Sequence, residues 1–156
     1  MPINRLTAHK VWISDMLLNP YIKTSGEFES NYVELKDKQV SRVNLIATIV
    51  DKMESADKNY VALVLDDGTG QIRLKTWRED TKIINNFNIG DSIIVIGRIK
   101  NYNDELYLLP EIVKNINLNW ELARKLELLK LYGKPNETHF VKPVSASENE
   151  EKVNIE

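Results

Sequence analysis

A short segment near the middle of the chain combines cations with an aromatic residue. Residues 71–77 read Gln-Ile-Arg-Leu-Lys-Thr-Trp. Successive side chains of a strand point to opposite faces, so Ile72, Leu74 and Thr76 would share one face. The other face would carry Gln71, Arg73, Lys75 and Trp77. An indole beside cations on the solvent face of a strand can stack on a nucleobase while the cations contact phosphates.

Residues 92–102 repeat this arrangement. Ile93, Val95 and Ile99 would face one side of a strand, and its polar end would carry Arg98, Lys100 and Tyr102. We expect the two strands to lie side by side and to turn both aromatics toward one open groove. The candidate residues for binding single-stranded nucleic acid are therefore Arg73, Lys75, Trp77, Arg98, Lys100 and Tyr102.

These residues also have structural interpretations, which the pattern alone leaves open. Trp77 would also fit at the mouth of a barrel or under a short helix, and Tyr102 is beside a turn. Cations on a strand often form only a solvated face. Tyr107, on a later strand, fits either a third stacking position or the core.

The distribution of charge matters more than its sum. The net charge is −2 and the isoelectric point is near 5.8, which argues against a generally basic nucleic-acid-binding protein. Residues 144–156, however, contain four glutamates and one lysine, whereas residues 70–78 contain three cations and no acid. A local basic surface is sufficient for phosphate contact.

The order of elements predicts an all-β protein built on a five-stranded OB-fold barrel. Segments rich in β-branched residues predict strands over residues 41–53, 60–65, 70–77, 92–102 and 105–113. Ile83, Ile84 and Phe87 have helical spacing, which predicts a short helix within residues 78–87. A helix between the third and fourth of five strands is typical of the OB fold.

The rest of the chain flanks this barrel, which occupies residues 41–116. Residues 1–40 are expected to form an N-terminal arm packed on the barrel, with a strand-like alternation over residues 8–14. Residues 117–133 are expected to form a C-terminal oligomerisation helix, and residues 134–156 a disordered acidic tail.

The C-terminal helix has an apolar stripe. Leu118, Leu122, Leu126 and Leu129 fall near one helical face. The stripe is wide for a surface helix. It either plugs the bottom of this chain's own barrel or forms the interface with a partner chain.

The sequence lacks the motifs that are typical of several functional classes. The sequence has no cysteine, and His9 and His139 are isolated, so we expect no disulfide, metal site or cofactor. No apolar run approaches the roughly 18 residues of a membrane span, and the N-terminus lacks a signal-peptide core. No paired acids or nucleophile–base pattern suggests an enzyme or a small-molecule substrate. We expect a cytoplasmic protein with no membrane partner.

Two segments resemble a known family. Residues 63–77, with the turn Asp-Asp-Gly-Thr-Gly, and residues 93–102 resemble the OB domain of the middle subunit of replication protein A. Residues 5–132 as a whole resemble the small single-OB subunits of the archaeal branch. The resemblance implies a DNA-binding subunit, acting in DNA replication, recombination and repair near an archaeal nucleoid. It also implies base stacking by Trp77 and Tyr102, and association with partner subunits through the helix after the barrel.

The chain departs from the family in two ways. It is too short for the winged-helix module of the longer middle subunits, and it lacks the cysteines of the large subunit's zinc module. Two alternatives stay open: an assembly scaffold with little DNA contact, and an RNA- or tRNA-binding OB module.

Overall fold

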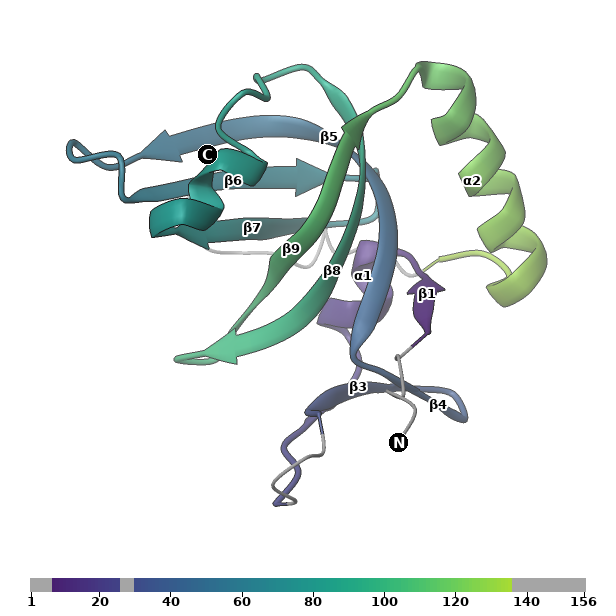
Figure 1. Cartoon of the computed structure of the whole chain (residues 1–156). Coiled ribbons are helices and arrows are strands. Elements are labelled where there is room, and N and C mark those ends of the chain that lie inside the picture. Colours follow the sequence, from purple (N-terminus) through teal and green to yellow (C-terminus); the bar gives the residue numbers. More distant parts are fainter. Residues whose placement is uncertain (1–6, 26–29, 136–156) are drawn as a thin grey trace, which may run out of the picture.

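The computed structural model describes residues 7–25 and 30–135, which form a β-barrel with additions at both ends (Figure 1). The elements before the barrel are β1 (Ala8–Lys10), α1 (Ile13–Leu17), β2 (Tyr21–Ile22), β3 (Tyr32–Leu35) and β4 (Lys38–Val40). The barrel and the C-terminal helix comprise β5 (Arg42–Glu54), β6 (Tyr60–Asp66), β7 (Gln71–Trp77), the 3-10 helix η1 (Arg78–Ile83), β8 (Ser92–Tyr102), β9 (Glu105–Asn115) and α2 (Leu118–Tyr132).

Five strands close on themselves in the order β5-β6-β7-β9-β8, with β5 also pairing with β8. The long strand β5 makes this closure possible: Arg42–Thr48 pair with β8, and Thr48–Glu54 pair with β6. The register shifts between Ile49 and Asp51, and such irregularities bend a strand. The predicted OB-fold barrel, with a short helix after the third of its strands, is confirmed.

The core lies inside the barrel and follows the predicted alternation. In β8, every second residue from Ile93 to Ile99 is buried. One of these positions is Gly97, where a Cβ atom would lie 2.7 Å from the carbonyl oxygen of Leu109. Only glycine allows β8 and β9 to approach this closely without a backbone shift.

The expectation that the two cation-bearing strands are neighbours is wrong. β9 lies between β7 and β8; it pairs in parallel with β7 and antiparallel with β8. The chain leaves β7 through η1 and a turn before it enters β8. A connection of this length can carry the chain past one strand position, so the order in sequence does not fix the order in space.

The predicted strand over residues 8–14 is correct only at its start. β1 pairs in parallel with β5, but α1 begins at Ile13. The turn between β6 and β7 explains this helix start: Asp67 Oδ2 accepts a hydrogen bond from the Ile13 amide at 2.8 Å, and Thr69 Oγ1 accepts one from the Ser14 amide at 3.1 Å. Amides of a first helical turn need such acceptors, and here they come from a distant loop.

The three short strands β2, β3 and β4 form a separate small antiparallel sheet below the barrel (Figure 1). α2 begins after Asn117, whose side-chain oxygen accepts a hydrogen bond from the Asn119 amide at 3.0 Å. It ends at Gly133, whose φ of 76° favours glycine. Of the predicted acidic tail, residues 136–156 lie outside the described residues. No helix among the described residues has the length and apolar character that crossing a membrane requires.

Candidate nucleic-acid interface

Trp77 lies at the centre of a surface cluster of three aromatic rings. Its side chain is 43% exposed at the end of β7. The ring of Tyr60, its cross-strand partner in β6, lies 5.5 Å away between centroids, and the ring of Tyr107 in β9 lies 6.0 Å away with edge-on geometry. We call Tyr60, Trp77 and Tyr107 the aromatic platform. Trp77 is therefore not sealed in the barrel, and its partners hold the indole while leaving part of it open.

The two cations of β7 lie beside this platform, but they are already paired. Lys75 Nζ lies 2.8 Å from Glu105 Oε1, and Arg73 Nε lies 3.5 Å from Glu105 Oε2. Lys75 also places its ammonium 4.7 Å from the centroid of the Tyr107 ring, and only 11% of its side chain is exposed. A single carboxylate of β9 thus bridges both cations.

The β8 candidates divide into two groups. Lys100 and Arg73 are both cross-strand partners of Tyr107, so these three side chains project from the same face of the sheet. Tyr102 ends β8 opposite Glu105 and is 67% exposed. Within the described residues, Lys100 has no acidic partner.

Arg98 belongs to a different cluster, on β5, β8 and β9. Its Nε lies 3.2 Å from Glu111 Oε2, and Arg42 Nε lies 2.7 Å from Glu111 Oε1. The structure therefore brings Arg73, Lys75 and Trp77 together on β7, with Lys100 and Tyr102 on β8, beyond the intervening strand β9. It pairs Arg98 elsewhere.

Tyr60, Glu105 and Glu111 were not selected from the sequence. Tyr60 had a usable signal, because it is the first residue of a predicted strand whose antiparallel partner ends at Trp77. Glu105 had no such signal, because its partner Lys75 is 30 residues away in sequence. Glu111 lies 13 residues from Arg98, across the short connection between two predicted strands, but its other partner, Arg42, is 69 residues away.

Glu111 provides a pH-dependent contribution to stability. Partial burial alone would raise the pKa of its carboxyl group, but hydrogen bonds and charge from Arg42 and Arg98 outweigh burial and lower it below the ordinary value of 4.5. A carboxyl group with a lowered folded-state pKa stabilises the fold above its unfolded-state pKa and loses that contribution as the pH falls through the folded-state pKa.

We therefore expect Glu111→Gln to lower the free energy of unfolding at neutral pH by less than about 1 kcal/mol, since the pair is partly exposed. The difference from the unsubstituted chain should vanish under acid conditions, below the folded-state pKa. Urea unfolding at a series of pH values measures this difference. A difference that stays constant through the acid range would show that the two ion pairs do not set it.

The open face continues beyond Arg73 toward α1. A hollow of about 400 Å³ lies where β7 and the start of β9 diverge. Its lining includes Leu17, Val64, Gln71, Arg73, Asp104 and Glu105. The hollow thus shares Arg73 and Glu105 with the ion pairs that lie beside the platform.

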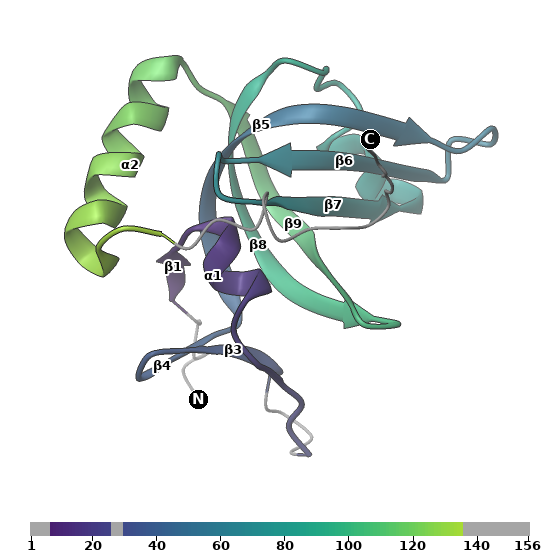
Figure 2. The same cartoon turned by 180° about the vertical axis from the view of Figure 1, so that it is seen from behind.

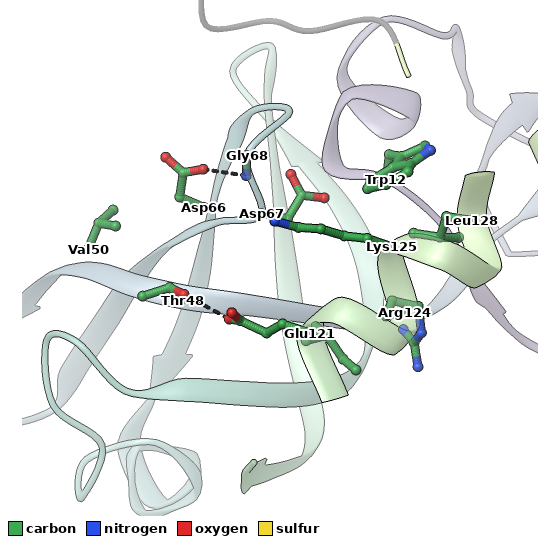
Figure 3. Close-up of a pocket in the computed structure, with 11 residues that line it drawn as sticks. Trp12, Thr48, Val50, Asp66, Asp67, Gly68, Glu121, Arg124, Lys125 and Leu128 are labelled. Atoms are coloured by element: carbon green, nitrogen blue, oxygen red, sulfur yellow. Dashed lines mark hydrogen bonds between the residues drawn. The ribbon is translucent and has the colours of Figure 1, made fainter. Parts of the chain in front are cut away.

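The acidic turn between β6 and β7 is structural. Asp66 Oδ1 accepts a hydrogen bond from the Gly68 amide at 2.7 Å (Figure 3), and Asp67 Oδ1 accepts from the Thr69 amide and hydroxyl. Burial raises the pKa of Asp67, although its hydrogen bonds from Thr69 and Ile13 oppose this effect. Among the described residues, no group of acids and histidines could hold a metal ion.

α2 packs on the barrel through a largely polar face. The buried guanidinium of Arg124 donates to the Asn44 carbonyl oxygen at 2.7 Å and to Asn44 Oδ1 at 2.8 Å. Thr48 donates to Glu121 at 2.9 Å, and Leu128 is the buried apolar residue of this face. A cavity of about 230 Å³ lies between helix and barrel, and Figure 3 shows Thr48, Glu121, Arg124 and Leu128 among the side chains that line it.

The leucine stripe points away from the barrel. The exposed fractions are 70% for Leu118, 60% for Leu122, 61% for Leu126 and 43% for Leu129. The alternative in which these leucines plug this chain's own barrel is therefore wrong. In both views, α2 stands at the side of the barrel opposite the β5–β6 loop and the end of β7 (Figures 1 and 2).

Comparisons with known proteins agree with this geometry. A family model described as an OB-fold nucleic acid binding domain matches residues 40–116. The chain is 26% identical over 149 residues to replication factor A protein 2 of Saccharomyces cerevisiae, covering 84% of this chain and 51% of that protein. It is 29% identical over 95 residues to a replication protein A 32 kDa subunit of Oryza sativa subsp. japonica, covering 59% of this chain and 31% of that protein.

Fold similarity extends over most of the described chain. A solved structure of a replication protein A heterotrimer bound to single-stranded DNA contains a similar chain, with a TM-score of 0.66 at 18% identity, covering 81% of this chain and 96% of that chain. At this identity the likeness shows the fold alone. The chain spans only about half and about a third of the two relatives' lengths. The resemblance predicted from the sequence is confirmed: the chain carries an OB fold over residues 40–116 and is similar in sequence to the 32 kDa-type subunits of replication protein A.

Proposed function

We propose that this protein is a single-stranded-DNA-binding subunit of a heteromeric complex of the replication protein A type. The observation that carries the proposal is the half-exposed Trp77, held by two tyrosines beside two cations on the outer face of β6, β7 and β9. This face of an OB barrel is where such domains bind oligonucleotides. The similarity to 32 kDa-type subunits supports the same role.

Binding combines stacking with backbone contact. One base stacks on Trp77 and another, further along the strand, stacks on Tyr102; stacking tolerates any sequence because every base has a π-face. Arg73 and Lys100 flank Tyr107 in the sheet, and the ammonium of Lys75 lies 4.7 Å from the centroid of the Tyr107 ring, so these three cations can follow the phosphates. We include neither Arg98, which pairs with Glu111, nor the cavity under α2. Because one barrel covers few nucleotides and its cations are partly neutralised, the affinity of the isolated chain is modest.

The partner surface is the outer face of α2. Four leucines that are 43–70% exposed form a stripe there, whereas the inner face binds the barrel through Arg124 and Glu121. A large apolar stripe left in water favours association. A partner subunit that presents its own apolar helix fits this surface. Both surfaces support a role in binding rather than in catalysis.

The scaffold alternative has one observation in its favour. Glu105 and Glu111 already neutralise Arg73, Lys75 and Arg98, so little positive charge is free to attract DNA. In that case α2 would provide the function and the barrel would only support it.

A competition experiment with the purified full chain separates these functions. The probe is a fluorescent single-stranded DNA of about 16 nucleotides, the upper size that one OB fold covers. We expect binding by anisotropy, weakened by salt, with duplex DNA and tRNA as poorer competitors than unlabelled single-stranded DNA. Stronger competition by tRNA would indicate an RNA-binding module. Absence of binding at low salt in a chain that still assembles would indicate a scaffold.

A further inference from the structure

Glu105 occupies an unusual position for an acid on a surface that binds nucleic acid. Its two carboxylate oxygens lie 2.8 Å from Lys75 Nζ and 3.5 Å from Arg73 Nε. These are the two cations nearest to Trp77 along β7. Glu105 therefore takes up the donors that a backbone phosphate would need.

The fold fixes Glu105 in this position. It follows the two-residue turn between β8 and β9, in which Asn103 and Asp104 both have positive φ, 51° and 63°. Two successive residues of this kind form the tight hairpin turn that matches strand twist. Because the register pairs Tyr102 with Glu105, the carboxylate is anchored directly opposite the exposed phenol.

The two cations differ in how easily a phosphate could reach them. Lys75 is enclosed between Glu105 and the Tyr107 ring, with 11% of its side chain exposed, whereas Arg73 is 47% exposed. Glu105 itself is 40% exposed. A DNA strand that passes over the platform would therefore contact Arg73 before Lys75. To make this contact, its phosphate would have to displace Glu105 from Arg73.

We propose that Glu105 is a specificity-determining residue of this surface, a built-in competitor for backbone phosphate at Arg73 and Lys75. This inference rests on the proposed function. Because the carboxylate neutralises the β7 cations, the affinity for a single strand comes mainly from stacking on Trp77 and Tyr102. The surface therefore selects strands with unpaired, stackable bases and binds polyanions without such bases poorly.

The test is the salt dependence of DNA binding by the full chain carrying Glu105→Gln, which removes the charge and keeps the size and polarity. Each additional phosphate contact with a single strand makes the slope of log K against log salt more negative by about 0.7. We expect one additional contact, at Arg73, and therefore about fivefold tighter binding at 0.1 M salt. Heparin, a polyanion without bases, should compete better against DNA on this variant than on the unsubstituted chain.

Glu111→Gln is the matched control. It removes the same charge from the same strand, and it also removes a carboxylate shared by two cations, Arg42 and Arg98, but in the cluster apart from the platform. We expect its slope to match that of the unsubstituted chain. An equal gain in DNA affinity in both variants would mean that the net charge of the chain alone sets the affinity. This result would overturn the proposal.

Other outcomes are equally decisive. A Glu105→Gln chain with an unchanged slope, or with weaker binding, would show that Glu105 only orients Lys75, while DNA binding by the unsubstituted chain would leave the proposed function intact. If neither the unsubstituted chain nor the Glu105→Gln variant binds single-stranded DNA at low salt, both the proposed function and this inference are wrong.

Discussion

Trp77→Ala is expected to weaken binding of single-stranded DNA by between about fivefold and about 150-fold. This range corresponds to the roughly 1–3 kcal/mol that base–aromatic stacking contributes per base, with 1.4 kcal/mol per factor of ten. Trp77 is the only ring of the platform that contacts both others, at 5.5 Å from Tyr60 and 6.0 Å from Tyr107. Its loss removes a stacking surface and loosens the rings beside it. Anisotropy titration at fixed salt measures the effect.

Trp120→Ala provides the matched control for this experiment. Trp120 is also a partly exposed tryptophan, at 59% against 43% for Trp77, but it lies on α2 at the other side of the barrel. We expect the Trp120 variant to bind DNA like the unsubstituted chain. The slope against salt should stay the same in the Trp77 variant, because stacking releases no counterions.

Circular dichroism has to show that the Trp77 variant keeps its barrel. The indole is partly exposed, and it packs on tyrosines rather than in the core, so the fold should persist. Full DNA affinity in a folded Trp77 variant would exclude stacking at this residue. The scaffold interpretation would then hold.

Residues whose position depends on local alternation were predictable from the sequence. The pattern of β7 placed Trp77 and Arg73 outside and Leu74 inside, as the structure has them. The same holds for β8, where Ile93 is buried and Tyr102 exposed. Such patterns need only the period of a strand, which is local information.

Long-range register was not predictable in this way. The position of β9 beside β7 brings together residues distant in sequence, such as Lys75 and Glu105, which are 30 residues apart. Arg42 and Glu111 are 69 residues apart, whereas the Arg98–Glu111 pair, 13 residues apart, is local to the β8–β9 hairpin. α1 also depends on distant residues, because its first amides are capped by Asp67 and Thr69. Neither acceptor is adjacent to the helix in sequence.

The orientation of α2 combines both kinds of information. Helical periodicity placed the four leucines on one face, but periodicity does not say which face meets the barrel. The face of α2 that packs on the barrel is fixed by Arg124, whose guanidinium donates to the carbonyl and side-chain oxygens of Asn44. A helix fixed by this polar contact leaves its leucines outside, which is the basis of the final prediction.

The double variant Leu122→Glu and Leu126→Glu is expected to abolish assembly with partner subunits. Burying one leucine contributes about 1.5–3 kcal/mol, so losing two should weaken association by at least about a hundredfold. Both side chains are about three-fifths exposed in the isolated chain, at 60% and 61%. The free energy of unfolding should therefore stay within about 0.5 kcal/mol of the original value, as for other surface changes.

Co-purification of the tagged chain from the cells that produce its partners, followed by mass measurement, tests this expectation. The matched control is Trp120→Glu with Leu131→Glu, two changes at residues 59% and 55% exposed on the same helix. With 3.6 residues per turn, these positions fall on the flank of α2 opposite the leucine stripe. Assembly should survive the control. Equal loss in both variants would mean that apolar exposure in general, and not the stripe, drives association. DNA binding by the isolated chain should be unchanged in both double variants. A loss of assembly without a loss of DNA binding would show that the partner surface acts independently of the aromatic platform on the other side of the barrel.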